Sequence, residues 1–252
     1  MKCYAPWTNL ELLSSGQIRP CCKFNPRHYE KDYNIRTDTI DDYLNSDMLA
    51  HVKESIQAGV YPKGCERCQI DEDAGLVSKP QLDYERWKDA YDNYKLHDGF
   101  ISSSIAFGNT CNLKCLTCSP KASSKWRNEW KHLFGEDILP LKDAVSDEFL
   151  NSFTAKSPGL IHIDIGGGES FLSQVHTQRA MLQHYVDTGQ SKNITLHYLT
   201  NGQQFPEDWF WELWENFKEV DLGLSIDGIE EQYEYIRFPA SWQTLTDNVK
   251  KY

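Results

Sequence analysis

Three cysteines, Cys111, Cys115 and Cys118, are separated by three residues and then by two. They follow the apolar, β-prone run 100–107, and the Gly-Asn-Thr sequence at 108–110 interrupts that run, which predicts a loop after the end of a strand. Three thiolates at this spacing can hold three irons of a 4Fe–4S cube and leave the fourth iron open, whereas a cluster that only transfers electrons normally takes four Cys. The alternative is a zinc knuckle, although zinc sites rich in cysteine usually contain two CxxC pairs.

A second group of four cysteines precedes this loop: Cys3, Cys21, Cys65 and Cys68. The segment between the first two predicts a short hairpin that turns at 14–16 and brings them side by side. Four thiolates suit either an iron–sulfur cluster or a structural zinc ion, and the spacing alone does not separate these two.

Cys22 is the remaining cysteine. Neighbouring residues in a strand point to opposite faces, so Cys21 and Cys22 are not expected to bind the same cluster. We expect Cys22 to be a small buried apolar residue, and the alternative is that it replaces Cys21 as a ligand.

Composition and charge exclude several classes of protein. The 252 residues are 40% hydrophobic and carry a net charge of −11, which argues against binding nucleic acid through a broad positive face. No apolar run approaches the ~20 residues that a membrane helix needs. The first residues lack the apolar region of a signal peptide, so we expect a cytoplasmic protein that binds neither membrane nor nucleic acid.

The pattern of apolar residues predicts three regions: 1–70, a helical connector at 71–98, and 99–252. The first region contains a predicted helix that begins at Thr39 or Ser46 and runs to about Ala58. The connector contains a helix from Pro80 to about His97. The third region alternates strands and helices, which indicates βα units and a parallel sheet. Its predicted strands are 100–107, 160–165, 194–199 and 220–226.

Residues suited to ligand binding follow each of these strands, and in βα barrels the chemistry collects at such strand ends. Glycines at 166–168 let the backbone approach a cofactor, and Glu169 can accept hydrogen bonds from an ammonium group. The planar guanidinium of Arg237 suits a carboxylate. Taken singly, each pattern has a simpler interpretation, because a glycine run is usually a turn and an arginine usually forms a surface ion pair.

The order of these motifs resembles the radical S-adenosylmethionine (SAM) superfamily. The chain carries CxxxCxxC, then GGE at 167–169, then TNG at 200–202 and SxDG at 225–228, one at each strand end. The opening region resembles the auxiliary-cluster domains called SPASM and twitch, since twelve residues separate Cys3 from Gly16, four separate Gly16 from Cys21, and a CxxC pair follows. The resemblance is strongest to proteins with an N-terminal twitch domain. Thr117 departs from the family, which often has an aromatic residue there.

The resemblance implies an α/β fold: a partial (β/α) barrel of radical SAM type, preceded by a small α+β iron–sulfur domain. Four βα units are visible where this family usually has six, so we expect the chain to be a fragment. The first cluster would be held by the 111–118 cysteines and the auxiliary 4Fe–4S cluster by the four earlier ones. The resemblance implies that seven residues bind SAM: Gly167, Gly168, Glu169, Asn201, Ser225, Asp227 and Arg237.

The implied activity is reductive cleavage of SAM to a 5′-deoxyadenosyl radical, which abstracts a hydrogen atom from a peptide or small-molecule substrate. The auxiliary cluster would assist oxidation or cross-linking, and flavodoxin or ferredoxin would donate electrons. No catalytic acid or base is assigned, and His162 and His197 are expected to be structural. An iron–sulfur electron carrier and a zinc-stabilised interaction module are the alternatives.

Overall fold

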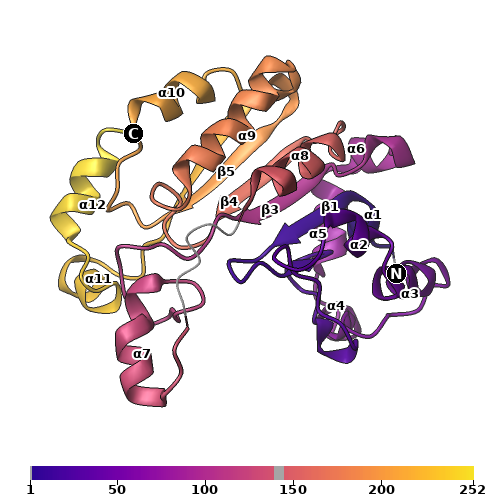
Figure 1. The fold of residues 1–252 in the computed structure, drawn as a ribbon, viewed down its shortest axis with the longest axis horizontal. Coiled ribbons are helices and arrows are strands. Elements are labelled where there is room, and N and C mark those ends of the chain that lie inside the picture. The colour runs from indigo at the N-terminus through magenta and orange to yellow at the C-terminus, as the bar shows by residue number, and fades with distance from the viewer. Residues whose placement is uncertain (1, 139–144) are drawn as a thin grey trace. The chain divides into compact units, whose positions relative to one another are not determined.

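The structure is a computed structural model that describes residues 2–138 and 145–252 (Figure 1). The chain divides into two compact units. The first comprises Met1–Leu12, Gln17–Ser103 and Glu148–Ile161, and the second comprises Leu13–Gly16, Ser104–Asp147 and His162–Tyr252. The predicted connector 71–98 therefore lies within the first unit.

The first unit opens with the short helix α1 (Ala5–Thr8) and the predicted hairpin, which is confirmed. Strand β1 (Asn9–Leu12) pairs antiparallel with β2 (Ile18–Arg19). The hairpin turns at Gly16, whose φ of 84° lies in the left-handed region that favours glycine. Leu10, Leu12 and Ile18 are buried and anchor the hairpin in the core of this unit.

The predicted helix at 39–58 is two helices, α2 (Ile40–Leu44) and α3 (Asp47–Gln57). Both predicted caps are used, because the Thr39 hydroxyl accepts a hydrogen bond from the Asp42 amide and the Ser46 hydroxyl accepts one from the Leu49 amide. Each cap begins its own helix, so the predicted start at Ser46 is confirmed by α3, whereas one continuous helix from Thr39 was wrong because α2 ends at Leu44.

The predicted helix at 80–97 is also broken. It is replaced by α5 (Lys79–Arg86), α6 (Lys88–Asp92) and the 3-10 helix η2 (Leu96–Asp98). The break falls at Trp87, whose ψ of 32° departs from helical geometry. The other helices of this unit are η1 (Pro26–His28), α4 (Glu66–Asp73) and α8 (Asp147–Ala155), the last almost entirely within it.

The strands of the third predicted region are all found, as β3 (Ser102–Ala106), β4 (His162–Gly166), β5 (Thr195–Thr200) and β6 (Glu219–Leu224). The order in the sheet is β2-β1-β3-β4-β5-β6, with β4, β5 and β6 parallel. The sheet is open in the part of the chain that the structure describes, and a closed radical SAM barrel is not confirmed. The helices of the second unit are η3 (Ser124–Trp126), α7 (Arg127–Phe134), α9 (Val175–Asp187), η4 (Gln190–Asn193), α10 (Asp208–Trp214), α11 (Glu230–Ile236) and α12 (Trp242–Val249).

The two faces of β4 and β5 differ in chemistry. Ile163 and Ile165 of β4 are completely buried, and Tyr198 of β5 packs against the rings of Phe210 and Trp214 in α10. These residues form the apolar core of the second unit. Because successive side chains alternate between faces, the intervening residues of both strands lie on the opposite face.

Across residues 2–138 and 145–252, no helix combines the length and apolarity needed to cross a membrane.

Candidate functional site

Four cysteines of the first unit line one cavity: Cys3, Cys21, Cys65 and Cys68. The rest of its wall is mainly apolar and includes Ala5, Phe24, Ile56 and Pro80. The structure therefore brings together the four residues that the sequence predicted as one ligand set. Their role as ligands stays a prediction.

Local structure explains how these cysteines converge. Cys3 precedes α1 and Cys21 follows β2, so the hairpin returns the chain to the place where it began. Cys65 caps α4, and the Cys68 amide donates to its carbonyl oxygen at 3.1 Å, which sets both thiols on one helical turn. Gly64 precedes this turn with a φ of 92°, and an added Cβ would lie 2.7 Å from the Asn25 carbonyl oxygen, so only glycine fits there.

Burial and mutual repulsion keep these thiols protonated in the absence of a metal. Burial raises the pKa of Cys3 to about 11 and that of Cys65 to about 12, and neighbouring thiols add to both shifts. The pKa of Cys21 is raised further still, mainly by burial and to a smaller extent by the nearby Cys3 thiol. A bound cation would stabilise the thiolates and reverse these shifts, because opposite charge favours the ionised form. The donor set therefore suits a metal or cluster that supplies positive charge.

Cys22 does not line the cavity. The expectation that it points away from Cys21 agrees with this placement. The expectation that it is buried was wrong, because the residue is exposed. It lies beyond the end of the short strand β2 and outside the cavity that Cys21 lines.

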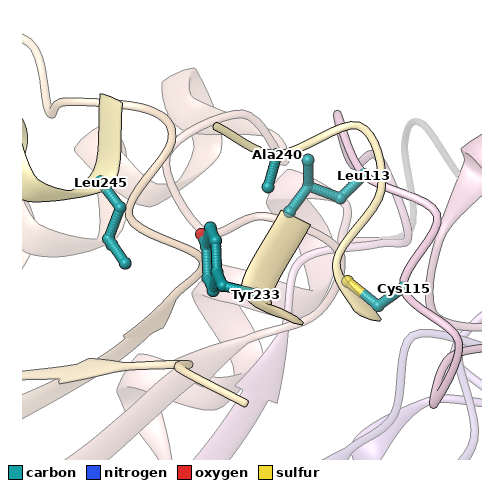
Figure 2. Close-up of a cluster of buried hydrophobic side chains, with 5 residues drawn as sticks. All are labelled: Leu113, Cys115, Tyr233, Ala240 and Leu245. Atoms are coloured by element: carbon teal, nitrogen blue, oxygen red, sulfur yellow. The ribbon is translucent and has the colours of Figure 1, made fainter. Parts of the chain in front are cut away.

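The three cysteines of the 111–118 motif lie on a loop of the second unit that is anchored by apolar packing. Figure 2 shows Leu113 and Cys115 in a buried cluster with Tyr233, Ala240 and Leu245. Leu113 is only 2% exposed, while Cys111 and Cys118 pack at the edge of this cluster. The apolar residue between the first two cysteines thus fixes the loop against α11 and α12.

Hydrogen bonds fix the loop at both ends. The Asn109 side-chain amide donates to the Pro120 carbonyl oxygen at 2.9 Å, and the Ser123 hydroxyl donates to the Leu113 carbonyl oxygen at 2.6 Å. The Trp126 indole donates to the Cys115 carbonyl oxygen at 3.0 Å. The loop backbone is therefore held in place by side chains on both sides of the motif.

Arg237 reaches the thiols of this loop. Its Nη1 lies 3.8 Å from Cys115 Sγ, its Nη2 lies 2.7 Å from an Asp227 carboxylate oxygen, and its side chain is 12% exposed. Burial raises the pKa of Cys115 and of Cys118, and the guanidinium opposes both shifts. Arg237 thus forms an ion pair, although not at the exposed surface as the simpler interpretation expected, and it also contacts the cysteine motif.

The Gly166–Glu169 turn follows β4 and approaches the cysteine loop through its backbone. Gly167 and Gly168 have φ values of 88° and 61°, and the Glu169 amide donates to the Thr110 carbonyl oxygen at 2.8 Å. An added Cβ on Gly168 would lie 2.1 Å from that same oxygen. The two glycines are therefore required by both conformation and space.

The Glu169 carboxylate is 1% exposed and connects two strand ends. One oxygen accepts from the Thr200 hydroxyl at 2.6 Å, and the other accepts from the Asn201 amide at 2.8 Å. Burial raises its pKa, which the Asn201 and Thr200 hydrogen bonds oppose. In this structure the Glu169 carboxylate holds the Thr200 hydroxyl and the Asn201 backbone amide in place.

Asn201 joins the third strand end to the cysteine motif. Its side-chain amide donates to Asn112 Oδ1 at 2.8 Å and lies 3.9 Å from Cys111 Sγ. Ser225 follows β6, and its amide donates to the Thr200 carbonyl oxygen at 2.9 Å. The structure thus connects the motifs of all four predicted strand ends, and their contacts to SAM stay predictions.

One polar cluster on the strands was missed by the sequence reasoning. His162 and Asp164 of β4 and His197 of β5 place their side-chain ligand atoms within 4.8 Å of one another. The signal available was the polar–apolar alternation His-Ile-Asp-Ile, but the third member depends on strand pairing.

Residues 3–69 match the iron–sulfur cluster-binding domain named SPASM. This match spans all four cysteines of the cavity, and it favours an iron–sulfur cluster over zinc there. SPASM domains occur in radical SAM proteins, where they bind iron–sulfur clusters. No family match covers the radical SAM core, and no curated protein matches the chain.

Proposed function

We propose that the chain is a radical SAM enzyme whose SPASM region carries an auxiliary cluster. The observation that carries this proposal is the connection of the three-cysteine loop to Glu169, Asn201 and Arg237 within one unit. An electron carrier needs only the cysteines, so the additional polar groups around them favour a cluster that also binds a small molecule.

The residues of the second unit fit a 4Fe–4S cluster with one open iron. Three thiols lie on one loop, and the other five cysteines of the chain belong to the first unit. The amide of Asn201 and the guanidinium of Arg237 contact sulfur atoms and can stabilise the negative charge of a thiolate-bound cluster.

The same residues fit the amino-acid part of SAM. Arg237 would bind the carboxylate through its guanidinium, and the backbone of the Gly166–Glu169 turn would meet the amino group. Glu169 holds that turn in place, because its buried carboxylate accepts hydrogen bonds from Thr200 and Asn201 at the end of β5. Asp227, which pairs with Arg237, orients the guanidinium before a ligand arrives.

When bound, the reduced cluster and SAM supply the 5′-deoxyadenosyl radical that removes a hydrogen atom from the substrate. The four cysteine thiols of the SPASM region suit an electron-transfer cluster, which would accept an electron from the substrate radical that hydrogen abstraction leaves. The substrate in this proposal is a peptide or a small molecule, and the electron donor is flavodoxin or ferredoxin.

The decisive experiment is reductive SAM cleavage. The protein is reconstituted anaerobically with iron and sulfide, reduced with dithionite and incubated with SAM, and 5′-deoxyadenosine is quantified. We expect release from the wild type and from the control Cys22→Ser, and none from Cys118→Ser. A brown protein that leaves SAM intact would be an electron carrier, and a colourless protein that retains zinc would be a structural module.

A further inference from the structure

We propose that His162, Asp164 and His197 form a binding site for a divalent transition-metal ion, separate from both cysteine sites. The cluster lies on the polar face of β4 and β5, opposite the apolar core of the second unit. His162 and Asp164 alternate along β4, and the register of β4 and β5 places His197 directly beside Asp164. Regular strands therefore bring all three side chains to one face.

The distances suit a shared ion. Asp164 Oδ1 lies 3.1 Å from His162 Nε2 and 2.7 Å from His197 Nδ1. Two ligand atoms that are each about 2.1 Å from one metal, at a right angle, lie about 3.0 Å apart. The observed pairs bracket this value, so small side-chain rotations would place a metal among the three atoms.

The ligand types indicate which ions fit. Two imidazoles and one carboxylate suit Fe(II), Mn(II) and Zn(II), and a three-residue set leaves coordination positions open for water or an oxygen donor of a substrate. Without a metal, Asp164 accepts hydrogen bonds from both rings, which is the competing explanation of this cluster.

Burial and charge favour access by a cation. The His162 side chain is 2% exposed, whereas those of Asp164 and His197 are 39% and 29% exposed, so the site has a rigid inner ligand and two that solvent can reach. The register places Asp221 of β6 beside His197 and Glu219 beside Thr195. Two further carboxylates on the same face raise the local concentration of cations.

The test uses Mn²⁺, because it prefers nitrogen and oxygen ligands and leaves the cysteine sites to iron. The full chain, reconstituted anaerobically, is titrated with Mn²⁺, and the electron paramagnetic resonance signal of the free ion is measured. We expect one saturable ion per chain, bound at least about tenfold more weakly by His197→Ala and by Asp164→Asn.

A matched control comes from His28, which lies 3.2 Å from a Glu66 carboxylate oxygen in a simple histidine–carboxylate pair. His28→Ala should leave Mn²⁺ binding unchanged. Thermal unfolding of each variant establishes that it is folded, and His197→Gln serves as a second variant at a partly exposed position. Absence of saturable uptake by the wild type, or uptake unchanged in the His197 variants, would overturn the proposal. Because Mn²⁺ binding is measured without SAM, its failure is distinguishable from failure of the proposed radical chemistry.

Discussion

Replacement of Gly168 by alanine should separate the two cysteine sites functionally. Gly168 lies in the turn after β4, with a φ of 61°, and a Cβ there would lie 2.1 Å from the Thr110 carbonyl oxygen. Thr110 directly precedes Cys111, so any displacement of its backbone moves the cysteine loop. Gly166, two residues earlier, is the matched control, because a Cβ there meets nothing within 4 Å and its φ is outside the left-handed region.

The cost has three contributions. A non-glycine residue in left-handed conformation costs about 1–2 kcal/mol. Loss of the hydrogen bond from the Glu169 amide to Thr110 removes about 0.5–1.5 kcal/mol. The overlap with the carbonyl oxygen adds the strain of moving the backbone. We therefore expect Gly168→Ala to lower the free energy of unfolding by at least about 2–3 kcal/mol, a decrease of about 5–10 °C in Tm.

The assay combines thermal unfolding with iron analysis after anaerobic reconstitution. Gly168→Ala should retain the cluster of the SPASM region and lose the one on the 111–118 loop, so its content should fall from about eight irons to about four. Gly166→Ala should keep both clusters, and its stability should change by less than about 1 kcal/mol. Full iron loading with unchanged Tm in Gly168→Ala, or equal loss in both variants, would refute the reasoning.

Three further predictions concern the thiols and Arg237. Cys22→Ser should retain the visible absorption of the auxiliary cluster and Cys65→Ser should lose it; equal loss would place Cys22 among the ligands. Arg237→Met should weaken SAM binding about 10–100-fold in equilibrium dialysis, since hydrogen bonds to charged groups contribute about 1.5–3 kcal/mol, and unchanged binding would remove Arg237 from the site. In the metal-free protein, thiols such as Cys21 stay protonated in the folded state at a pH where the unfolded chain ionises, so the native state binds more protons above about pH 9. The free energy of unfolding should therefore fall as pH rises above about 9, by about 1.4 kcal/mol per pH unit for each such thiol. Denaturant titrations at successive pH values would measure this decrease. A free energy of unfolding that does not change with pH would show that the thiols are already ionised or accessible.

Local signals in the sequence predicted most of the elements. The hairpin, the caps at Thr39 and Ser46 and the strands β3 to β6 follow from short-range patterns of turns, caps and apolar residues. The break at Trp87 was missed because the periodicity of apolar residues indicates which face of a helix is buried and carries no signal for where the helix is interrupted.

The parts of the site that were missed depend on contacts between distant segments. Glu169 was predicted to meet a ligand, but its burial against Thr200 and Asn201 follows only from the packing of β4 beside β5. His162 and His197 were each predicted to be structural. That they lie beside Asp164 follows only from the register of β4 and β5. The spacing of the cysteines, by contrast, is local and was sufficient to group them.

The hydrogen bonds of Glu169 have a consequence for affinity. Because they join the turns after β4 and β5 before any ligand binds, the loss of conformational entropy that ordering these loops requires occurs when the protein folds. A small molecule would then meet a preorganised surface, and its dissociation constant would rise as the free energy of unfolding of the unit falls. Substitutions in the apolar core, far from any ligand, should consequently weaken binding by loosening this junction.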